Sequence, residues 1–173
     1  MIEKLDPKEF DRVFSIMEQS FPLEEYRPYL GQKALLDDSA YTIFVAKEED
    51  RILGLAAVWQ LENWLFLEHL AVDPQYRNQG IGAKLLQYVS DDRCCLEVEP
   101  PVTELSHRRI GFYERNGFFF NPYPYEQPSL APGRSPVPLY IMTSGSPVTP
   151  EEFGEIRELL YNRVYGRKKS EVS

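Results

Sequence analysis

LFLEHLAVDPQYRNQGIGAKLL, residues 65–86, is the stretch that decides the fold. Its first part is apolar except for Glu68 and His69, as expected for a buried strand. A turn follows, and after Gly80 and Gly82 the apolar residues return at helical spacing. The stretch therefore predicts a strand, a loop and a helix, in that order.

The two glycines lie where the helix is predicted to begin. Glycine lets the backbone come close to a bound group, and the first N–H groups of a helix have no partner within the helix. The positive end of the helix dipole adds to this, so the pattern favours an anion site, most simply for a phosphate. Gly-x-Gly is also common in ordinary turns, and on this stretch alone both interpretations are open.

The length and composition predict one globular domain. The chain has 173 residues, of which 43% are hydrophobic and 27% charged. These are globular values, and the length suits a single core. We expect one domain over residues 1–166 and a tail, 167–173, that frays.

Several classes of protein are disfavoured. There is no run of about 18 apolar residues and no signal-peptide core, so we expect a soluble, cytoplasmic protein without a membrane partner. Cys94 and Cys95 are adjacent, which suits neither a disulfide framework nor a metal site, and no metal is predicted. The net charge of −8 argues against nucleic-acid binding and favours small cationic partners.

The predicted elements around residues 65–72 form a mixed sheet. Residues 41–46 alternate in polarity and residues 51–61 return after a charged turn, so the first three strands of this region form an antiparallel meander. The helix at 80–92 connects to a strand at 94–99, which must therefore run parallel to residues 65–72. The predicted fold class is α/β (α+β), with a mixed, mostly antiparallel sheet flanked by helices.

The remaining predicted elements come before and after this region of the chain. Residues 1–5 predict a short strand, followed by a helix that ends before Pro22; a further helix spans 103–116. Residues 118–120 predict a short buried strand, and 121–138, with six prolines, a long loop. A strand at 137–142 precedes a C-terminal helix at about 150–165, which would pack on the domain or on a second copy in a homodimer.

Two segments are candidates for a substrate pocket. Residues 24–27 follow the first predicted helix without a regular apolar stripe and are either a pocket wall or a solvated connector. The proline-rich loop contributes tyrosines, which favours a functional wall. The candidate substrate residues, with one carboxylate from the parallel strand, are Glu24, Glu25, Tyr26, Arg27, Glu97, Tyr123 and Tyr125.

A second motif, residues 109–118, RIGFYERNGF, places Tyr113 near the end of a helix beside the parallel strand. Together the motifs resemble the GCN5-related N-acetyltransferase (GNAT) superfamily. The family's phosphate-loop pattern is Arg or Gln, two residues, Gly, one residue, and Gly or Ala, met here by Arg77, Gly80 and Gly82. The later pattern Phe-Tyr-x-x-x-Gly-Phe is met by residues 112–118, and the resemblance covers residues 41–142.

The resemblance implies an enzyme that binds acetyl-coenzyme A where two parallel central strands splay apart. It would transfer the acetyl group directly, in a ternary complex, to an amine of a small molecule or peptide. Tyr113 would protonate the departing thiolate, since a phenol and a thiol have comparable acidities. The residues implied to bind the cofactor are Leu70, Ala71, Val72, Arg77, Asn78, Gln79, Gly80, Ile81, Gly82, Ala83, Ser106 and Tyr113. Many relatives carry Asn where this chain has Ser106, a departure from the family pattern.

The attacking amine must lose a proton to a general base, directly or through water. Glu68 is the first candidate, because on a regular strand it shares a face with Leu70 and Val72 while His69 points to the opposite face. Glu97 and Glu99 are the next candidates. A Glu among apolar residues can also simply pair with an arginine, so the base remains open.

Other readings of the glycine loop fit less well. The loop lacks the Gly-Lys-Ser/Thr ending of a P-loop, and Leu85 occupies the third glycine position of a dinucleotide fingerprint. The alternative that remains is an acyl-coenzyme A sensor or interaction module without turnover, against which Tyr113 argues.

Overall fold

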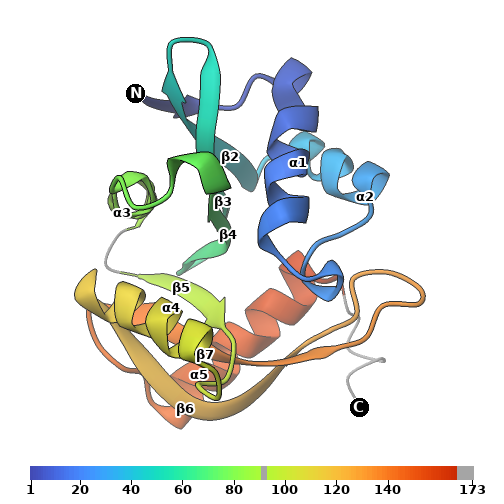
Figure 1. Ribbon diagram of the computed structural model, residues 1–173. Helices are drawn as coiled ribbons and strands as arrows, with labels where there is room; N and C mark the ends of the chain where they lie inside the picture. Colours follow the sequence, from blue (N-terminus) through green and yellow to red (C-terminus); the bar gives the residue numbers. More distant parts are fainter. Residues whose placement is uncertain (91–92, 167–173) are drawn as a thin grey trace.

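The protein is built on one mixed sheet with helices on both faces (Figure 1), seen in a computed structural model that describes residues 1–90 and 93–166. The sheet has seven strands in the order β1-β2-β3-β4-β5-β7-β6. The β4–β5 pair is parallel and the other neighbouring pairs are antiparallel. The predicted fold class is confirmed.

The strands are β1 (Ile2–Lys4), β2 (Tyr41–Glu48), β3 (Arg51–Gln60), β4 (Leu65–Val72), β5 (Cys94–Val98), β6 (Phe118–Gln127) and β7 (Val137–Ser144). The helices are α1 (Phe10–Ser20), α2 (Tyr29–Ala34), α3 (Ile81–Val89), α4 (Glu104–Arg115) and α5 (Pro150–Leu159), and a π-helical turn, Leu160–Val164, continues α5. The helix predicted to reach Asp92 ends at Val89; Asp92 itself lies outside the described residues.

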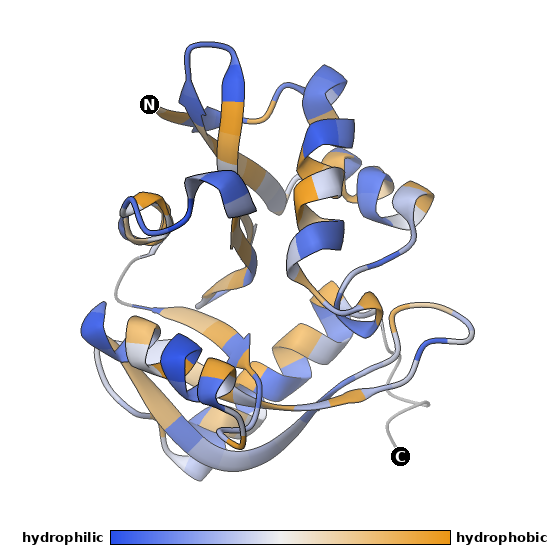
Figure 2. Cartoon of the chain, in the orientation of Figure 1, coloured by the Kyte–Doolittle hydropathy of each residue, from blue (hydrophilic) through white to orange (hydrophobic). Residues whose placement is uncertain are grey.

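Two apolar clusters hold the layers together. On one face of the sheet Phe10 and Met17 of α1 pack in the same cluster as Phe153 and Ile156 of α5. The other face is covered by α3 and α4, with Leu85 and Ile110 buried. The C-terminal helix thus packs on its own domain. Figure 2 shows that the tip of the β2–β3 hairpin is hydrophilic, whereas the strands below it are apolar.

The region after α4 differs from its prediction. Residues 118–120 are not a short strand, because β6 extends to Gln127 and the loop is confined to 128–136. β6 lies at the edge of the sheet, and its register against β7 shifts between Asn121 and Tyr125. An edge position with an irregular register tolerates proline, since no ladder partner needs its N–H. That explains how Pro122 and Pro124, from the predicted loop, lie within β6.

The central feature is the separation of β4 from β5. They pair only from Leu65 to Leu67, opposite residues 94–96. At the next residue β4 has a β-bulge, because Leu67 pairs with Val58 and His69 with Ala57, which leaves Glu68 without an opposite residue on β3. A bulge bends a strand and increases its twist. β4 and β5 consequently diverge beyond this point (Figure 1).

Candidate functional site

A cavity of about 610 Å³ lies between the diverging strands. One wall comes from the end of β4 and the loop that leads into α3. The other comes from the end of β5 and from α4, and the end of α1 closes one side. The lining residues, in chain order, include Ser20, Phe21, Glu25, Leu70, Ala71, Val72, Tyr76, Arg77, Asn78, Gly80, Ile81, Gly82, Ala83, Glu97, Val98, Glu99, Leu105, Arg108, Arg109, Phe112, Tyr113 and Arg115.

The glycine loop presents backbone N–H groups to this cavity. Asn78 and Gly80 have φ angles of 65° and 77°, in the left-handed region that Asn and Gly adopt most readily. In the described part of the chain no side chain caps α3, so its first N–H groups remain available. A Cβ on Gly82 would lie 3.7 Å from Phe112 Cζ and from Val72 Cγ2, which shows how closely the helix start approaches α4 and β4. The loop thus brings an uncapped helix start to the cavity wall.

The predicted cofactor residues lie on this cavity with two exceptions. Leu70, Ala71 and Val72 line it from β4, whose edge has no β5 partner beyond Leu67. Gln79 is not among the lining residues. Ser106 is also absent from the lining: it is buried and forms the capping box of α4, where its Oγ lies 3.0 Å from the Thr103 N–H.

Tyr113 faces the cavity from α4. Its ring packs edge-on between Phe112 and Phe118, with centroid distances of 5.2 and 5.9 Å. Burial raises the pKa of the phenol, against a smaller lowering by Arg109. No protein hydrogen bond to its hydroxyl is found within the described ranges. The hydroxyl is therefore free to exchange a proton with a bound group.

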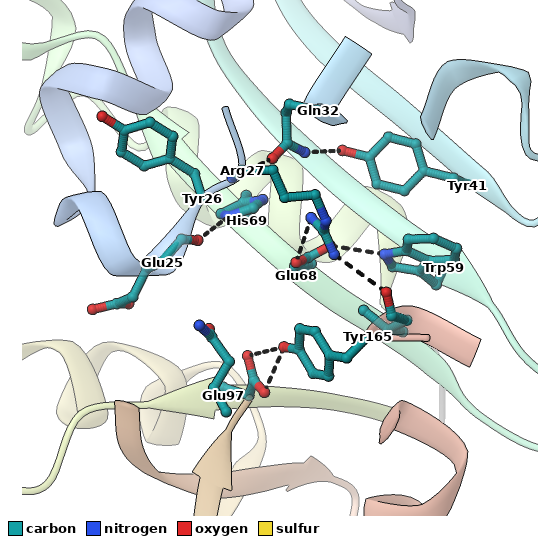
Figure 3. Close-up of polar contacts among 12 residues, drawn as sticks. Glu25, Tyr26, Arg27, Gln32, Tyr41, Trp59, Glu68, His69, Glu97 and Tyr165 are labelled. Atoms are coloured by element: carbon teal, nitrogen blue, oxygen red, sulfur yellow. Dashed lines mark hydrogen bonds and ion pairs between the residues drawn. The ribbon is translucent and has the colours of Figure 1, made fainter. Parts of the chain in front are cut away.

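Glu68, the first candidate for a base, is fully engaged. Its Oε2 accepts a hydrogen bond from Arg27 Nη1 at 2.9 Å and its Oε1 one from Trp59 Nε1 at 2.8 Å (Figure 3). Burial alone would raise the pKa of Glu68, but Arg27 and these hydrogen bonds outweigh it and hold the pKa below its ordinary value. Glu68 is a buried ion-pair partner and a weak base.

The bulge also overturns the predicted side-chain directions on β4. Glu68 contacts Trp59, and His69 packs its ring 4.9 Å from that of Phe21, so both lie on the α1 and α5 face. Leu70 packs with the opposite cluster. The prediction that Glu68 shares a face with Leu70, with His69 opposite, was wrong, because the two residues of a bulge face one residue on the partner strand.

Glu97 lies inside the fold between two phenols. Tyr125 donates to its Oε2 at 2.6 Å. The Tyr165 hydroxyl lies 2.8 and 2.7 Å from its two oxygens (Figure 3). Burial raises the pKa of Glu97 to about 8, although the two phenolic hydrogen bonds act in the opposite direction. Both carboxyl oxygens are thus already occupied by the protein.

Glu25 and Glu99 complete the acidic side of the cavity. Glu99 Oε1 is paired with Arg109 Nη1 at 3.0 Å. The carboxylate of Glu25 has neither an ion pair nor a hydrogen bond in the described part of the chain. Burial, and then repulsion from Glu99, raises the pKa of Glu25 to about 7. Of these carboxylates, Glu25 is the one that is unengaged, lines the cavity and changes charge near neutral pH.

The other candidate substrate residues do not line the cavity. Tyr26 and Arg27 are buried beneath it, and the Tyr123 hydroxyl donates to the Val148 carbonyl at 3.0 Å. Tyr125 is buried, and its hydroxyl donates to Glu97. Arg108, Phe21 and Leu105 also line the cavity. They were not predicted, because nothing in their local sequence distinguishes them from ordinary helix or helix-end residues.

The described residues contain neither a membrane-spanning helix nor a metal-binding cluster. None of their helices is long and apolar enough to cross a membrane. Their His, Cys, Asp and Glu side chains form no group of three or more that could hold a metal ion.

The chain is similar to known proteins both in sequence and in fold. The sequence model of the acetyltransferase (GNAT) domain matches residues 39–118. A GNAT-family protein from Bacteroides thetaiotaomicron is 30% identical, with 97% of this chain and 99% of that chain covered and a TM-score of 0.87.

Two more distant matches complete the comparison. YjbC of Bacillus subtilis is 27% identical over 106 residues, 59% of this chain, and the match spans 54% of YjbC. A GNAT-family structure from Elizabethkingia anophelis, which has acetyl-coenzyme A bound, shares the fold at 17% identity and a TM-score of 0.55, with 83% of this chain and 96% of that chain covered.

Proposed function

The chain belongs to the GNAT acetyltransferase family, and from that premise we propose that it transfers an acetyl group from acetyl-coenzyme A to an amine. The transfer is direct, within a ternary complex, and the acceptor is a small molecule or a peptide. The observation that carries the proposal is the juxtaposition, in one cavity, of an uncapped helix N-terminus, an unengaged phenol and an unengaged carboxylate.

The residues present fit acetyl-coenzyme A. The N–H groups at the start of α3 suit a pyrophosphate, and Arg77, Arg108 and Arg115 add positive charge to the cavity wall. The unpaired edge of β4 at residues 70–72 offers backbone hydrogen bonds to an amide-containing arm. When bound, the cofactor supplies an acetyl thioester, and the Elizabethkingia protein binds the same molecule.

Glu25 acts as the general base. An amine reaches the cavity chiefly as the ammonium ion, and the Glu25 carboxylate takes its proton so that the nitrogen becomes nucleophilic. A base works best when its pKa is near the working pH, and the pKa of Glu25 is raised to about 7. Glu68, Glu97 and Glu99 are less suitable because each already binds donors from the protein.

Tyr113 acts as the general acid. Its hydroxyl gives a proton to the sulfur that leaves, and burial among Phe112 and Phe118 keeps the phenol protonated until then. Glu25 takes a proton from the acceptor amine, whereas Tyr113 gives one to the leaving sulfur. Each is therefore open to a separate test.

The proposal is tested by measuring coenzyme A release with a panel of monoamines, diamines and peptide N-termini. We expect turnover with at least one of them, with kcat/KM rising with pH through about 7. The pH of this limb should be the same for acceptors of different basicity, because the titrating group belongs to the enzyme.

Glu25→Gln should lower kcat/KM by about 10²- to 10⁴-fold and remove the limb, whereas Glu18→Gln, an exposed change on α1, should do neither. Tight acetyl-coenzyme A binding without release of coenzyme A for any amine would instead support the sensor function and overturn the proposal.

A further inference from the structure

Residues 24–26 are held by an unusual set of contacts. Three successive backbone carbonyl oxygens each accept a hydrogen bond from a distant side chain. Gln127 Nε2 donates to Glu24 O at 2.9 Å, His69 Nε2 lies 2.7 Å from Glu25 O, and Arg134 donates to Tyr26 O. The segment is therefore held in place by the fold and is not a solvated connector, and Glu25 lines the cavity from it.

Among these donors, His69 alone acts on Glu25 itself. A carbonyl oxygen only accepts, so Nε2 carries the proton and Nδ1 is the bare nitrogen. Nδ1 is buried and has no hydrogen-bond partner in the part of the chain that the structure describes. The ring is 2% exposed and packs on Phe21, which fixes its orientation. Of the two ring nitrogens, only Nε2 therefore forms a hydrogen bond within the described protein, and its partner is the Glu25 carbonyl oxygen.

The bulge in β4 makes this contact available. Because Glu68 and His69 both face the α1 side, Glu68 binds Arg27 while His69 binds Glu25 (Figure 3). On a regular strand His69 would face α3 and could not reach the segment. Two consecutive strand residues therefore hold two alternate residues, Arg27 and Glu25, of which Glu25 lines the cavity.

A neutral donor suits this position. Burial lowers the pKa of His69, so the ring is uncharged at neutral pH. A cation in its place would stabilise the charged form of Glu25 and lower the pKa of that carboxyl. The charged groups that act on Glu25 are Glu24 beside it, Glu97 and Glu99 from β5 and its end, and Arg109 from α4; those that act on His69 are Glu68 and Arg27.

We propose that His69 is a positioning residue for catalysis, which holds the backbone at Glu25 so that the Glu25 carboxylate faces the acceptor amine in a partly desolvated place. This inference rests on the proposed function. It assigns a specific task to a histidine that neither donates nor accepts the transferred protons.

Three substitutions distinguish the effect of the His69 hydrogen-bond donor from the effect of its ring packing. His69→Gln places an amide N–H near the position of Nε2 and should retain kcat/KM within about threefold. His69→Phe keeps the ring and its contact with Phe21 but has no donor, and should lower kcat/KM at neutral pH at least tenfold with an unchanged KM for acetyl-coenzyme A. His69→Asn, whose shorter amide does not reach the carbonyl, replaces His69→Phe if that variant does not fold.

The pH profile is the decisive readout. Without the bond, Glu25 becomes more solvated, so the acid limb of kcat/KM should move from about 7 toward the ordinary carboxyl value. Gln127→Met, which removes the bond to Glu24 O, is the matched control and should move the limb less. An unmoved limb in His69→Phe, or an equal movement in Gln127→Met, overturns the assignment. If Glu25→Gln itself leaves the profile unchanged, the base is wrong, and this failure is distinguishable from failure of the His69 contact alone.

Discussion

At the scale of single residues, the same side chain has different properties according to its partners. Glu68 is buried against Arg27 and has a lowered pKa, whereas Glu97 is buried against two phenols and has a raised one. A cation compensates the burial of a carboxylate more fully than neutral donors do. The carboxylate of Glu25 is paired with neither a cation nor a neutral donor of the described protein, and it keeps the capacity to bind a substrate proton.

Tyr113→Phe should separate catalysis from binding. We expect kcat to fall by about 10²- to 10⁴-fold, because the general acid is lost. Since the hydroxyl has no bond to the described protein, its removal leaves no buried group unpaired, and stability should change by less than about 0.5 kcal/mol. Steady-state kinetics measures kcat and denaturant unfolding measures stability, and a calorimetric titration should give an unchanged affinity for acetyl-coenzyme A.

The matched control for this prediction is Tyr140→Phe. Tyr140 lies on β7 against Phe120 and does not line the cavity, so kcat should be unchanged. If Tyr113→Phe has the same kcat as wild type across the pH range, Tyr113 has no part in the proton transfer.

At the scale of elements, short irregularities position the site. The bulge in β4 separates that strand from β5 and turns two polar residues toward α1. The caps of α4 and α5 are of the same type, with Thr103 paired with Ser106 and Thr149 with Glu152. Ser106, which belongs to the cap of α4, is also a residue that the family resemblance assigns to cofactor binding.

Ser106→Ala tests which role that residue has. The serine is committed to the cap, with Oγ donating to Thr103 O at 2.9 Å, so we expect a loss of about 1 kcal/mol in unfolding free energy and unchanged affinity for acetyl-coenzyme A. Denaturant unfolding and calorimetry give the two values. Thr149→Ala, in the equivalent cap of α5, should cost about 1 kcal/mol as well and also leave affinity unchanged. A selective loss of affinity in Ser106→Ala would show that the serine contacts the cofactor.

At the scale of the whole molecule, a buried acidic group makes stability depend on pH. Burial raises the pKa of Glu97 from 4.5 to about 8, so between these values the folded state holds more protons than the unfolded state. Stability therefore falls as the pH rises through this window. Glu25 acts in the same direction up to about 7.

Glu97→Gln should make the dependence of Tm on pH shallower between about pH 5 and pH 9, because the substituted side chain binds no proton. The direct measurement is a series of thermal melts across this range. Glu155→Gln, an exposed change on α5, should retain the wild-type slope. A slope as steep in Glu97→Gln as in wild type would mean that another group dominates the pH dependence.

Much of the fold and of the donor side of the site was accessible from sequence. The strand, loop and helix of residues 65–86, the parallel strand after them and the position of Tyr113 depend on periodicity, glycine placement and local connection rules, all of which act over short distances. These features were predicted because local chemistry is sufficient to specify them.

The acceptor side was decided only by the tertiary structure. Glu68 looked like a base until Arg27, 41 residues earlier, was found on its carboxylate, and Glu97 is held by Tyr165, 68 residues later. The bulge depends on how β4 pairs with β3, and the length of β6 on its place at the sheet edge. The basicity of a carboxylate is set by what surrounds it in space. The amino-acid sequence by itself therefore determined which acidic groups were present, and the fold determined that, among the described carboxylates lining the cavity, Glu25 is left unengaged.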